Sequence, residues 1–212
     1  DLICYKPFRN EPEVIGLICT IGYSFFLKNS SQIVFGTEQQ LMPDVFGNNF
    51  IAWGNIRITY VQIFVVAIVI LLTFALQLFL HRTKTGISLR AISMNKKASA
   101  LLGVNINRTI SLGNSLGCAL GGIAGILLGI YYNAIHPMMG STIMLKAFIC
   151  VVFGGLNSVL GAAIGGILLG VFENLGVAFF GSGYRDIIGF IILILILLVK
   201  PSGLLGRKGV EL

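Results

Sequence analysis

The chain has 212 residues, of which 56% are hydrophobic and only 11% are charged, and its formal net charge is +7. This composition excludes a water-soluble fold, because too few polar side chains are present to cover its surface. Apolar runs recur along the whole chain, which also excludes a signal peptide followed by a soluble domain, and the basic residues cluster beside these runs rather than among exposed aromatics, which excludes nucleic-acid binding.

The apolar runs predict an all-α polytopic membrane protein with a bundle of transmembrane helices. The first run, 14–27, contains glycine and is too short to cross a bilayer unaided. The second, 58–80, carries no charge and would span about 34 Å as a helix, which exceeds the hydrocarbon core. Further apolar segments cover 111–130, 142–155, 158–180 and 185–199.

The distribution of charge predicts the topology. The loop 81–109 carries six basic residues and no acidic one, so the positive-inside rule places it in the cytoplasm. The stretch from Lys28 to Arg57 is balanced in charge, and we expect it on the outside. The segment 131–144 and the beginning of the last apolar run should lie outside as well, whereas the basic C-terminal segment should be cytoplasmic.

Within the basic loop, the stretch from Leu89 to Leu102 has good helix formers and is followed by Gly103, where a helix would stop. Ala91, Met94, Ala98 and Leu101 recur at helical spacing. This pattern predicts one short helix that lies flat at the cytoplasmic face. From the pattern alone, the helix could equally be an anchor in the lipid headgroups.

Small residues dominate the segment 111–130, where Gly113, Gly117, Gly121 and Gly125 repeat at every fourth position. A small-xxx-small pattern allows two backbones to approach closely, so we expect this helix inside the bundle.

A helical hairpin is predicted between 142 and 180. Turn-forming residues interrupt the apolar sequence, and Gly154, Gly155, Asn157 and Ser158 are the candidates for a helix break beside the translocation path. The inbound helix is short, and it is expected to be re-entrant. Two short, glycine-containing segments in one chain also point to a substrate path near the membrane midplane.

The intramembrane charges of this hairpin, Lys146 and Glu173, sit at similar depths near the outer ends of its two helices. A charge in hydrocarbon costs about 2.5–3.5 kcal/mol, so we expect the two to pair. A pair that ties the helices together is favoured over direct substrate contact. Arg185 and Asp186 could hold the charged ends of an amino acid, but anchoring at the membrane interface is the preferred interpretation.

Sequence motifs for catalysis or cofactor binding are missing. The chain has no G-x-x-x-x-G-K-[ST] loop and no H-E-x-x-H motif, and its four cysteines form no C-x-x-C pair. We therefore predict no catalytic residue, no cofactor and no metal site. If ATP powers transport, another chain must bind it.

Several stretches together resemble the permease subunits of bacterial branched-chain amino acid ABC importers, of the high-affinity leucine/isoleucine/valine type. The resemblance covers nearly all of the chain. The matching stretches are Leu89-Arg90-Ala91 through Asn95, 98–107, Leu145-Lys146-Ala147-Phe148, Phe153 to Ser158 with Gly161 to Gly166, and 200–206.

The resemblance implies that the short helix of the loop docks in a groove on an ATPase. In this family the helix carries an E-A-A-x-x-x-G motif, and here Lys97-Ala98-Ser99 and Gly103 stand at its positions, with Lys97 in place of the acidic residue and Ser99 in place of the second alanine. The implied coupling residues are Leu89, Arg90, Ala91, Met94, Asn95, Lys97, Ala98, Ser99, Leu101 and Gly103.

It also implies one transmembrane permease domain over 1–212 that works in the inner (plasma) membrane as part of a complex. The expected partners are a second homologous permease subunit, two cytoplasmic ABC ATPases, an extracytoplasmic substrate-binding protein, the lipid bilayer and an amino-acid or urea-like substrate. Such permeases carry further helices before Tyr5, so we expect this copy to be incomplete at its N-terminus. The alternatives are a secondary transporter or channel without an ATPase, and an intramembrane enzyme.

Overall fold

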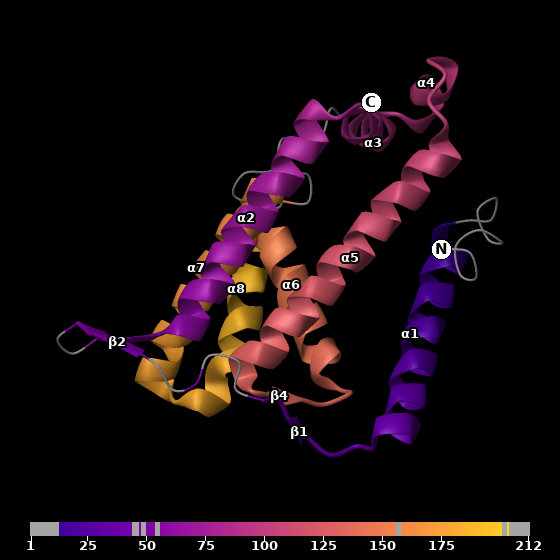
Figure 1. Cartoon of the computed structure of the whole chain (residues 1–212). Coiled ribbons are helices and arrows are strands. Elements are labelled where there is room, and N and C mark those ends of the chain that lie inside the picture. Colours follow the sequence, from indigo (N-terminus) through magenta and orange to yellow (C-terminus); the bar gives the residue numbers. More distant parts are fainter. Residues whose placement is uncertain are drawn as a thin grey trace. The chain divides into compact units, whose positions relative to one another are not determined.

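The computed structural model describes residues 13–43, 47, 50–53, 56–155, 158–200 and 203. The chain divides into two compact units. One unit comprises Asp1–Ile70 and Leu78–Met139, and the other comprises Leu71–Gln77 and Gly140–Leu212. Figure 1 labels most of the elements, which are numbered in chain order.

The first unit begins with a helix that is longer than the sequence predicts. Helix α1 (Glu13–Phe35) has 23 residues, whereas the apolar run covers only 14–27. The polar residues after Leu27 continue the helix because no glycine or proline occurs between Gly22 and Gly36 to stop it. At about 1.5 Å per residue α1 is about 34 Å long. The helix is longer than its apolar run, but it is not among the described helices that are both long and apolar enough to cross a membrane.

Short antiparallel strands follow α1 and precede α2 (Tyr60–Arg82). Strand β2 (Phe50–Trp53) pairs with β3 (Ile56–Thr59), and β1 (Gln40–Leu41) pairs with β4 (Ala134–Ile135). Beside β1, the Met42 backbone N–H donates to the carbonyl of Asn133 over 3.1 Å. The β1–β4 pairing therefore joins two segments that the charge pattern assigns to the same, outer side of the membrane.

The basic loop contains two helices, not the one continuous helix that the sequence predicts. Helix α3 (Lys84–Met94) ends at Asn95, and α4 (Lys96–Leu101) begins directly after it. Asn95 is extended, with φ −154° and ψ 106°, and its side-chain oxygen accepts a hydrogen bond from Ala98 N. An asparagine that caps a new helix in this way competes with continuation of the old one. As predicted, α4 stops before Gly103, which has φ +80°.

Helix α5 (Ile106–Tyr132) starts earlier than the apolar segment 111–130 because Asn105 caps it, accepting a hydrogen bond from Arg108 N. At Gly113 an added Cβ would lie 2.9 Å from the Leu89 side chain. At Gly117, Gly121 and Gly125 an added Cβ would meet none of the described atoms within 4 Å. Of these four glycines, Gly113 is therefore the one that makes a close contact among the described residues of this unit.

The second unit holds the predicted hairpin, formed by α6 (Met139–Gly154) and α7 (Val159–Phe180). Gly155 has φ +106° after the end of α6, and the Ser158 hydroxyl caps α7 by accepting a hydrogen bond from Gly161 N over 3.0 Å. Asn157, the remaining residue of the predicted break, lies outside the described residues. The 3₁₀ turn η1 (Ser182–Tyr184) then leads into α8 (Arg185–Val199).

Glycines bring α6 and α7 into backbone contact near the turn. A Cβ added at Gly161 would overlap the carbonyl group of Gly154, and one added at Gly165 would lie 2.5 Å from the Cys150 carbonyl oxygen. Gly203, which follows α8, approaches the same place, where its Cβ would lie 2.5 Å from Gly155 N. No larger residue fits at these contacts, so the turn end of the unit is held by backbone packing.

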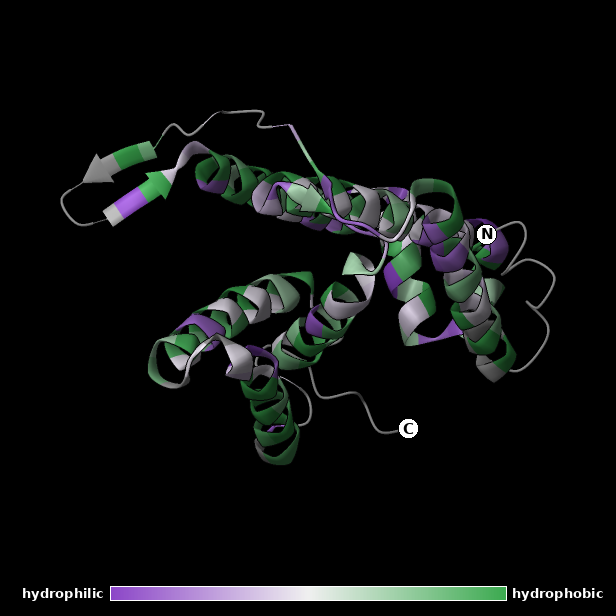
Figure 2. Ribbon diagram, turned by 90° about the horizontal axis from the view of Figure 1, so that it is seen from below, coloured by the Kyte–Doolittle hydropathy of each residue, from purple (hydrophilic) through white to green (hydrophobic). Residues whose placement is uncertain are grey.

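Three helices among the described residues are long and apolar enough to cross a membrane, namely Tyr60–Arg82, Ile106–Tyr132 and Val159–Phe179, and Met139–Gly154 is a shorter apolar helix. Hydrophobic residues extend along most of the helical length in Figure 2, and hydrophilic ones occupy short stretches. None of the Tyr60–Arg82 span is buried inside the structure. A helix that is apolar all round and uncovered by protein is suited to contact with lipid.

The glycine contact can be tested with two substitutions in α7. Alanine is favoured over glycine in a helix interior by about 0.5–1 kcal/mol, but Gly161→Ala would force the Gly154 backbone away at a cost of about 1–3 kcal/mol. We expect Gly161→Ala to lower the thermal unfolding midpoint of the detergent-purified protein. Gly170→Ala is the control, because an added Cβ there meets nothing within 4 Å. Equal midpoints for the two variants would contradict the contact.

Candidate functional site

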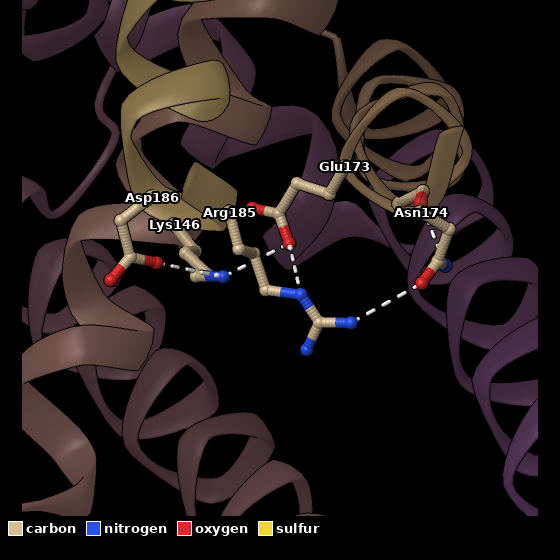
Figure 3. Close-up of polar contacts among 6 residues, drawn as sticks. Lys146, Glu173, Asn174, Arg185 and Asp186 are labelled. Atoms are coloured by element: carbon tan, nitrogen blue, oxygen red, sulfur yellow. Dashed lines mark hydrogen bonds and ion pairs between the residues drawn. The ribbon is translucent and has the colours of Figure 1, made fainter. Parts of the chain in front are cut away.

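The polar side chains of the second unit meet where α6, α7 and α8 lie close together. Lys146 Nζ on α6 is 2.9 Å from Glu173 Oε2 on α7 and 3.2 Å from Asp186 Oδ1 on α8. Arg185 places Nε 3.9 Å from the same oxygen of Glu173 and donates from Nη2 to Asn174 Oδ1 over 3.2 Å. Figure 3 shows Lys146 between the two carboxylates and Arg185 between Glu173 and Asn174.

The four ionisable groups of this charge cluster (Lys146, Glu173, Arg185 and Asp186) form a neutral set of two cations and two anions. Their side-chain exposures differ, at 11% for Glu173, 30% for Lys146, 43% for Arg185 and 61% for Asp186. The Glu173 carboxylate is the member that most needs neutralisation, because a buried unpaired charge is costly. The Lys146–Asp186 pair is more exposed and should contribute less.

The structure thus brings together the two charges that the sequence analysis paired, Lys146 and Glu173. Sequence reasoning missed the participation of Asp186, Arg185 and Asn174, and it preferred interfacial anchoring for the first two. The sequence did contain a signal that Arg185 and Asp186 lie near this pair. The predicted topology already put 181–186 on the outer side of the membrane, which is the side near which the Lys146–Glu173 pair was expected.

A shallow, partly open concavity lies beside the charge cluster. Its lining combines the charged groups of Lys146, Glu173 and Asp186 with a hydroxyl and an apolar wall, and the other lining residues are Thr142, Leu145, Ile149, Gly189 and Phe190. Polar groups that converge in a mostly apolar concavity are typical of a small-molecule site.

The coupling residues implied by the resemblance do not form one helix face. Ser99 is buried at 3% exposure, and its hydroxyl donates to the Asn95 carbonyl over 2.8 Å. Leu89 and Ala91 are half-buried, whereas Arg90, Asn95, Lys97, Ala98 and Gly103 are exposed. Met94, Leu101 and Leu102 are among the most exposed hydrophobic residues, at 84%, 90% and 82%. The break at Asn95 separates Met94 from Leu101, so the predicted continuous stripe is wrong.

The residues of the predicted helix break have structural contacts of their own. Gly154 and Gly155 are buried, and Ser158 is half-buried as the cap of α7. Their glycine contacts explain why small residues are needed here. A role beside the translocation path stays a prediction.

A double-mutant cycle tests the charge cluster. Lys146→Met leaves two carboxylates with one cation, and Glu173→Gln leaves two cations with one carboxylate. We expect each to destabilise the protein by about 2–3 kcal/mol, somewhat below the value for fully buried pairs. The double variant retains Arg185 and Asp186, whose charges balance, so it should be more stable than either single variant in thermal unfolding of the purified protein.

Asp186→Asn provides the comparison, because Asp186 is 61% exposed and its loss should cost about 1 kcal/mol or less. Additive losses from Lys146→Met and Glu173→Gln would show that the two groups are not coupled in this way.

The comparisons with known proteins point to one family. The model of the family described as "Branched-chain amino acid transport system / permease component" matches residues 13–197. The chain is 38% identical to the high-affinity branched-chain amino acid transport system permease protein BraD of Pseudomonas aeruginosa, over 100% of this chain and 70% of the relative.

Two further relatives carry similar names. The permease protein LivH of Escherichia coli is 37% identical over 100% of this chain and 70% of its own length. The probable LivH of Methanocaldococcus jannaschii is 37% identical over 96% of this chain and 68% of its own. No solved structure matches the chain significantly. With its apolar helices, the chain is a multi-pass helical membrane protein, and it belongs to the family of permease components of branched-chain amino acid transport systems.

Proposed function

We propose that this chain is the membrane-spanning permease subunit of an ATP-driven importer of branched-chain or related amino acids in the inner (plasma) membrane. The observation that carries the proposal is identity of 37–38% across the whole chain to relatives that are named permease proteins of high-affinity branched-chain amino acid transport systems. The helices that could cross a membrane and the neutral charge cluster agree with it. Substrate would pass along a path formed by these helices.

The subunit performs no covalent chemistry in this proposal. ATP is bound and hydrolysed by two cytoplasmic ATPases, a second homologous permease subunit completes the path, and an extracytoplasmic binding protein delivers the amino acid. ATP binding favours one arrangement of the ATPase pair, and this bias moves the cytoplasmic ends of the permease helices. Alternating access then follows as a shift between two conformational states.

The docking surface for the ATPase would be the α3–α4 segment, which lies within the basic loop 81–109. The side chains of Met94, Leu101 and Leu102 are almost fully exposed in this segment. Large apolar side chains in a water-facing loop are favourable when a partner covers them. Buried Ser99 and the Asn95 cap hold α4 in place, so the exposed leucines are displayed on an ordered turn.

Uptake by the reconstituted complex tests the proposal. The wild-type chain, assembled in proteoliposomes with its ATPases, second permease and binding protein, should take up radiolabelled leucine only when ATP is inside. Leu101→Asp should leave the chain inserted but weaken ATPase association by about 10-fold or more, since an anchor residue typically contributes over 1 kcal/mol.

Leu41→Asp is the matched control. Leu41 is 86% exposed, and its replacement makes the same chemical change outside the basic loop. This variant should leave ATPase co-purification and uptake unaltered. Uptake without ATP would favour a secondary transporter or channel instead. Normal ATPase co-purification and uptake in Leu101→Asp would favour the alternative that the α3–α4 segment is an anchor in the lipid headgroups.

A further inference from the structure

The hairpin formed by β2 and β3 has little contact with the rest of the described chain. Its strands pair with each other in a sheet that has only these two strands. Among the described elements, no other helix or strand packs extensively against it. An isolated two-stranded hairpin is at best marginally stable in water and needs a further surface to pack on. The surface that supports this hairpin therefore lies outside the described chain.

One face of the hairpin is wholly apolar. The register pairs Ile51 with Ile58. The next pair on the same face is Trp53 with Ile56, because residues two apart in a strand share a face. All four positions of this face, which we call the Ile51 face, are apolar. Ile51 and Ile58 are 45% and 41% exposed, so the structure leaves them largely uncovered.

The opposite face of the hairpin carries a charge. Its positions are taken by two pairs, Phe50 with Thr59 and Ala52 with Arg57. Arg57 is exposed, and its guanidinium carbon lies 5.5 Å from the centroid of the Phe50 ring, which is a cation–π contact. The hairpin is therefore amphipathic, with an apolar face on one side and a cation on the other.

The hairpin is joined directly to α2. Strand β3 ends at Thr59 and α2 begins at Tyr60, without a linker between them. The Thr59 N–H donates to the Gln62 side chain over 3.2 Å, which holds the junction in place. Figure 1 shows the hairpin extending from the start of α2. At about 3.3 Å per residue, Ile58 lies within about 7 Å of the first helical residue.

The surface of α2 indicates what covers the Ile51 face. None of the α2 span is buried inside the structure, and its 23 residues give about 34 Å against a hydrocarbon core of about 30 Å. The first turn of α2 therefore reaches the boundary between hydrocarbon and headgroups. Tyr60 is 46% exposed at this point, and tyrosine is enriched at that boundary. The Ile51 face thus begins where the lipid-facing surface of α2 ends, at the opposite end of the helix from the basic loop.

We propose that the β2–β3 hairpin lies in the headgroup region of the bilayer, with the Ile51 face against the acyl chains and Arg57 toward water and the lipid phosphates. Lipid is then the surface on which the hairpin packs, and the hairpin holds the start of α2 at a fixed depth. Burial of the two isoleucines in the acyl region stabilises a hairpin that would be marginal in water. The inference concerns anchoring in the membrane and is independent of the transported substrate.

The only tryptophan of the chain, Trp53 in β2, is a native probe of this contact. The full chain is reconstituted in phosphatidylcholine vesicles whose acyl chains carry bromine near the headgroup end, and its emission is compared with that in unbrominated vesicles. Bromine quenches tryptophan only at close range. We expect a large loss of emission in the brominated vesicles. A smaller loss is expected when the bromine lies near the terminal methyl group, because the hairpin lies at the boundary and not at the midplane.

Moving the probe by one residue tests the orientation of the hairpin. In Ile51→Trp/Trp53→Phe the tryptophan stays on the Ile51 face, whereas in Phe50→Trp/Trp53→Phe it lies on the opposite face. Both variants keep apolar side chains at the exchanged positions, and the second keeps an aromatic ring beside Arg57. We expect brominated lipid to quench position 51 more strongly than position 50. Iodide, present in the water on both sides of the membrane, should show the reverse order.

Three results would overturn the lipid contact. Equal quenching of positions 50 and 51 by brominated lipid would contradict the orientation. Quenching of position 51 by iodide and not by lipid would place the Ile51 face in water. Protection of position 51 from iodide only after the extracytoplasmic binding protein is added would show that a protein covers this face instead.

Discussion

A carboxylate buried among apolar helices has to be neutralised, and this constraint decides how α6, α7 and α8 come together. Glu173 is 11% exposed, and the only cations within ion-pair distance in the described chain are Lys146 on α6 and Arg185 at the start of α8. Neutralising Glu173 therefore requires contact with both neighbouring helices, α6 and α8. Asp186 then balances the second cation, so a neutral set of four groups fastens three helices without leaving a net charge in an apolar environment.

The opposite end of the same unit is held by a different interaction. Near the turn between α6 and α7, backbone meets backbone at Gly161 and Gly165, and Gly203 after α8 approaches Gly155. Charge pairing at one end and glycine packing at the other leave these helices little freedom to slide past one another. Together they explain how a 16-residue helix such as α6, near the lower length for crossing a membrane, keeps a defined position.

The hairpin, its glycine-containing turn and the Lys146–Glu173 pair could be predicted from sequence, because apolar runs, turn residues and isolated charges are local and strong signals. Asp186 and Arg185 could not be assigned from local pattern, since charged residues at a helix start serve equally as interfacial anchors. The break at Asn95 was not predicted because the apolar residues on both sides of it keep helical spacing, although asparagine favours helix caps over helix interiors. Its extended backbone and the hydrogen bond from Ala98 N mark the start of a new helix. The length of α1 was missed because its polar second half resembles a loop in composition.

Exchanging two of the four charges is the most direct test of whether they act as one neutral set. In Lys146→Glu/Glu173→Lys the swapped pair still attracts, but the carboxylate introduced at position 146 faces Asp186, and the ammonium introduced at position 173 faces Arg185. These like charges meet where the native ion pairs lie 3.2 Å and 3.9 Å apart. The thermal unfolding midpoint of the purified protein should therefore be lower for the exchanged variant than for neutral Lys146→Met/Glu173→Gln. An exchanged variant as stable as the wild type would contradict the neutral set, since it would show that Lys146 and Glu173 form an isolated pair.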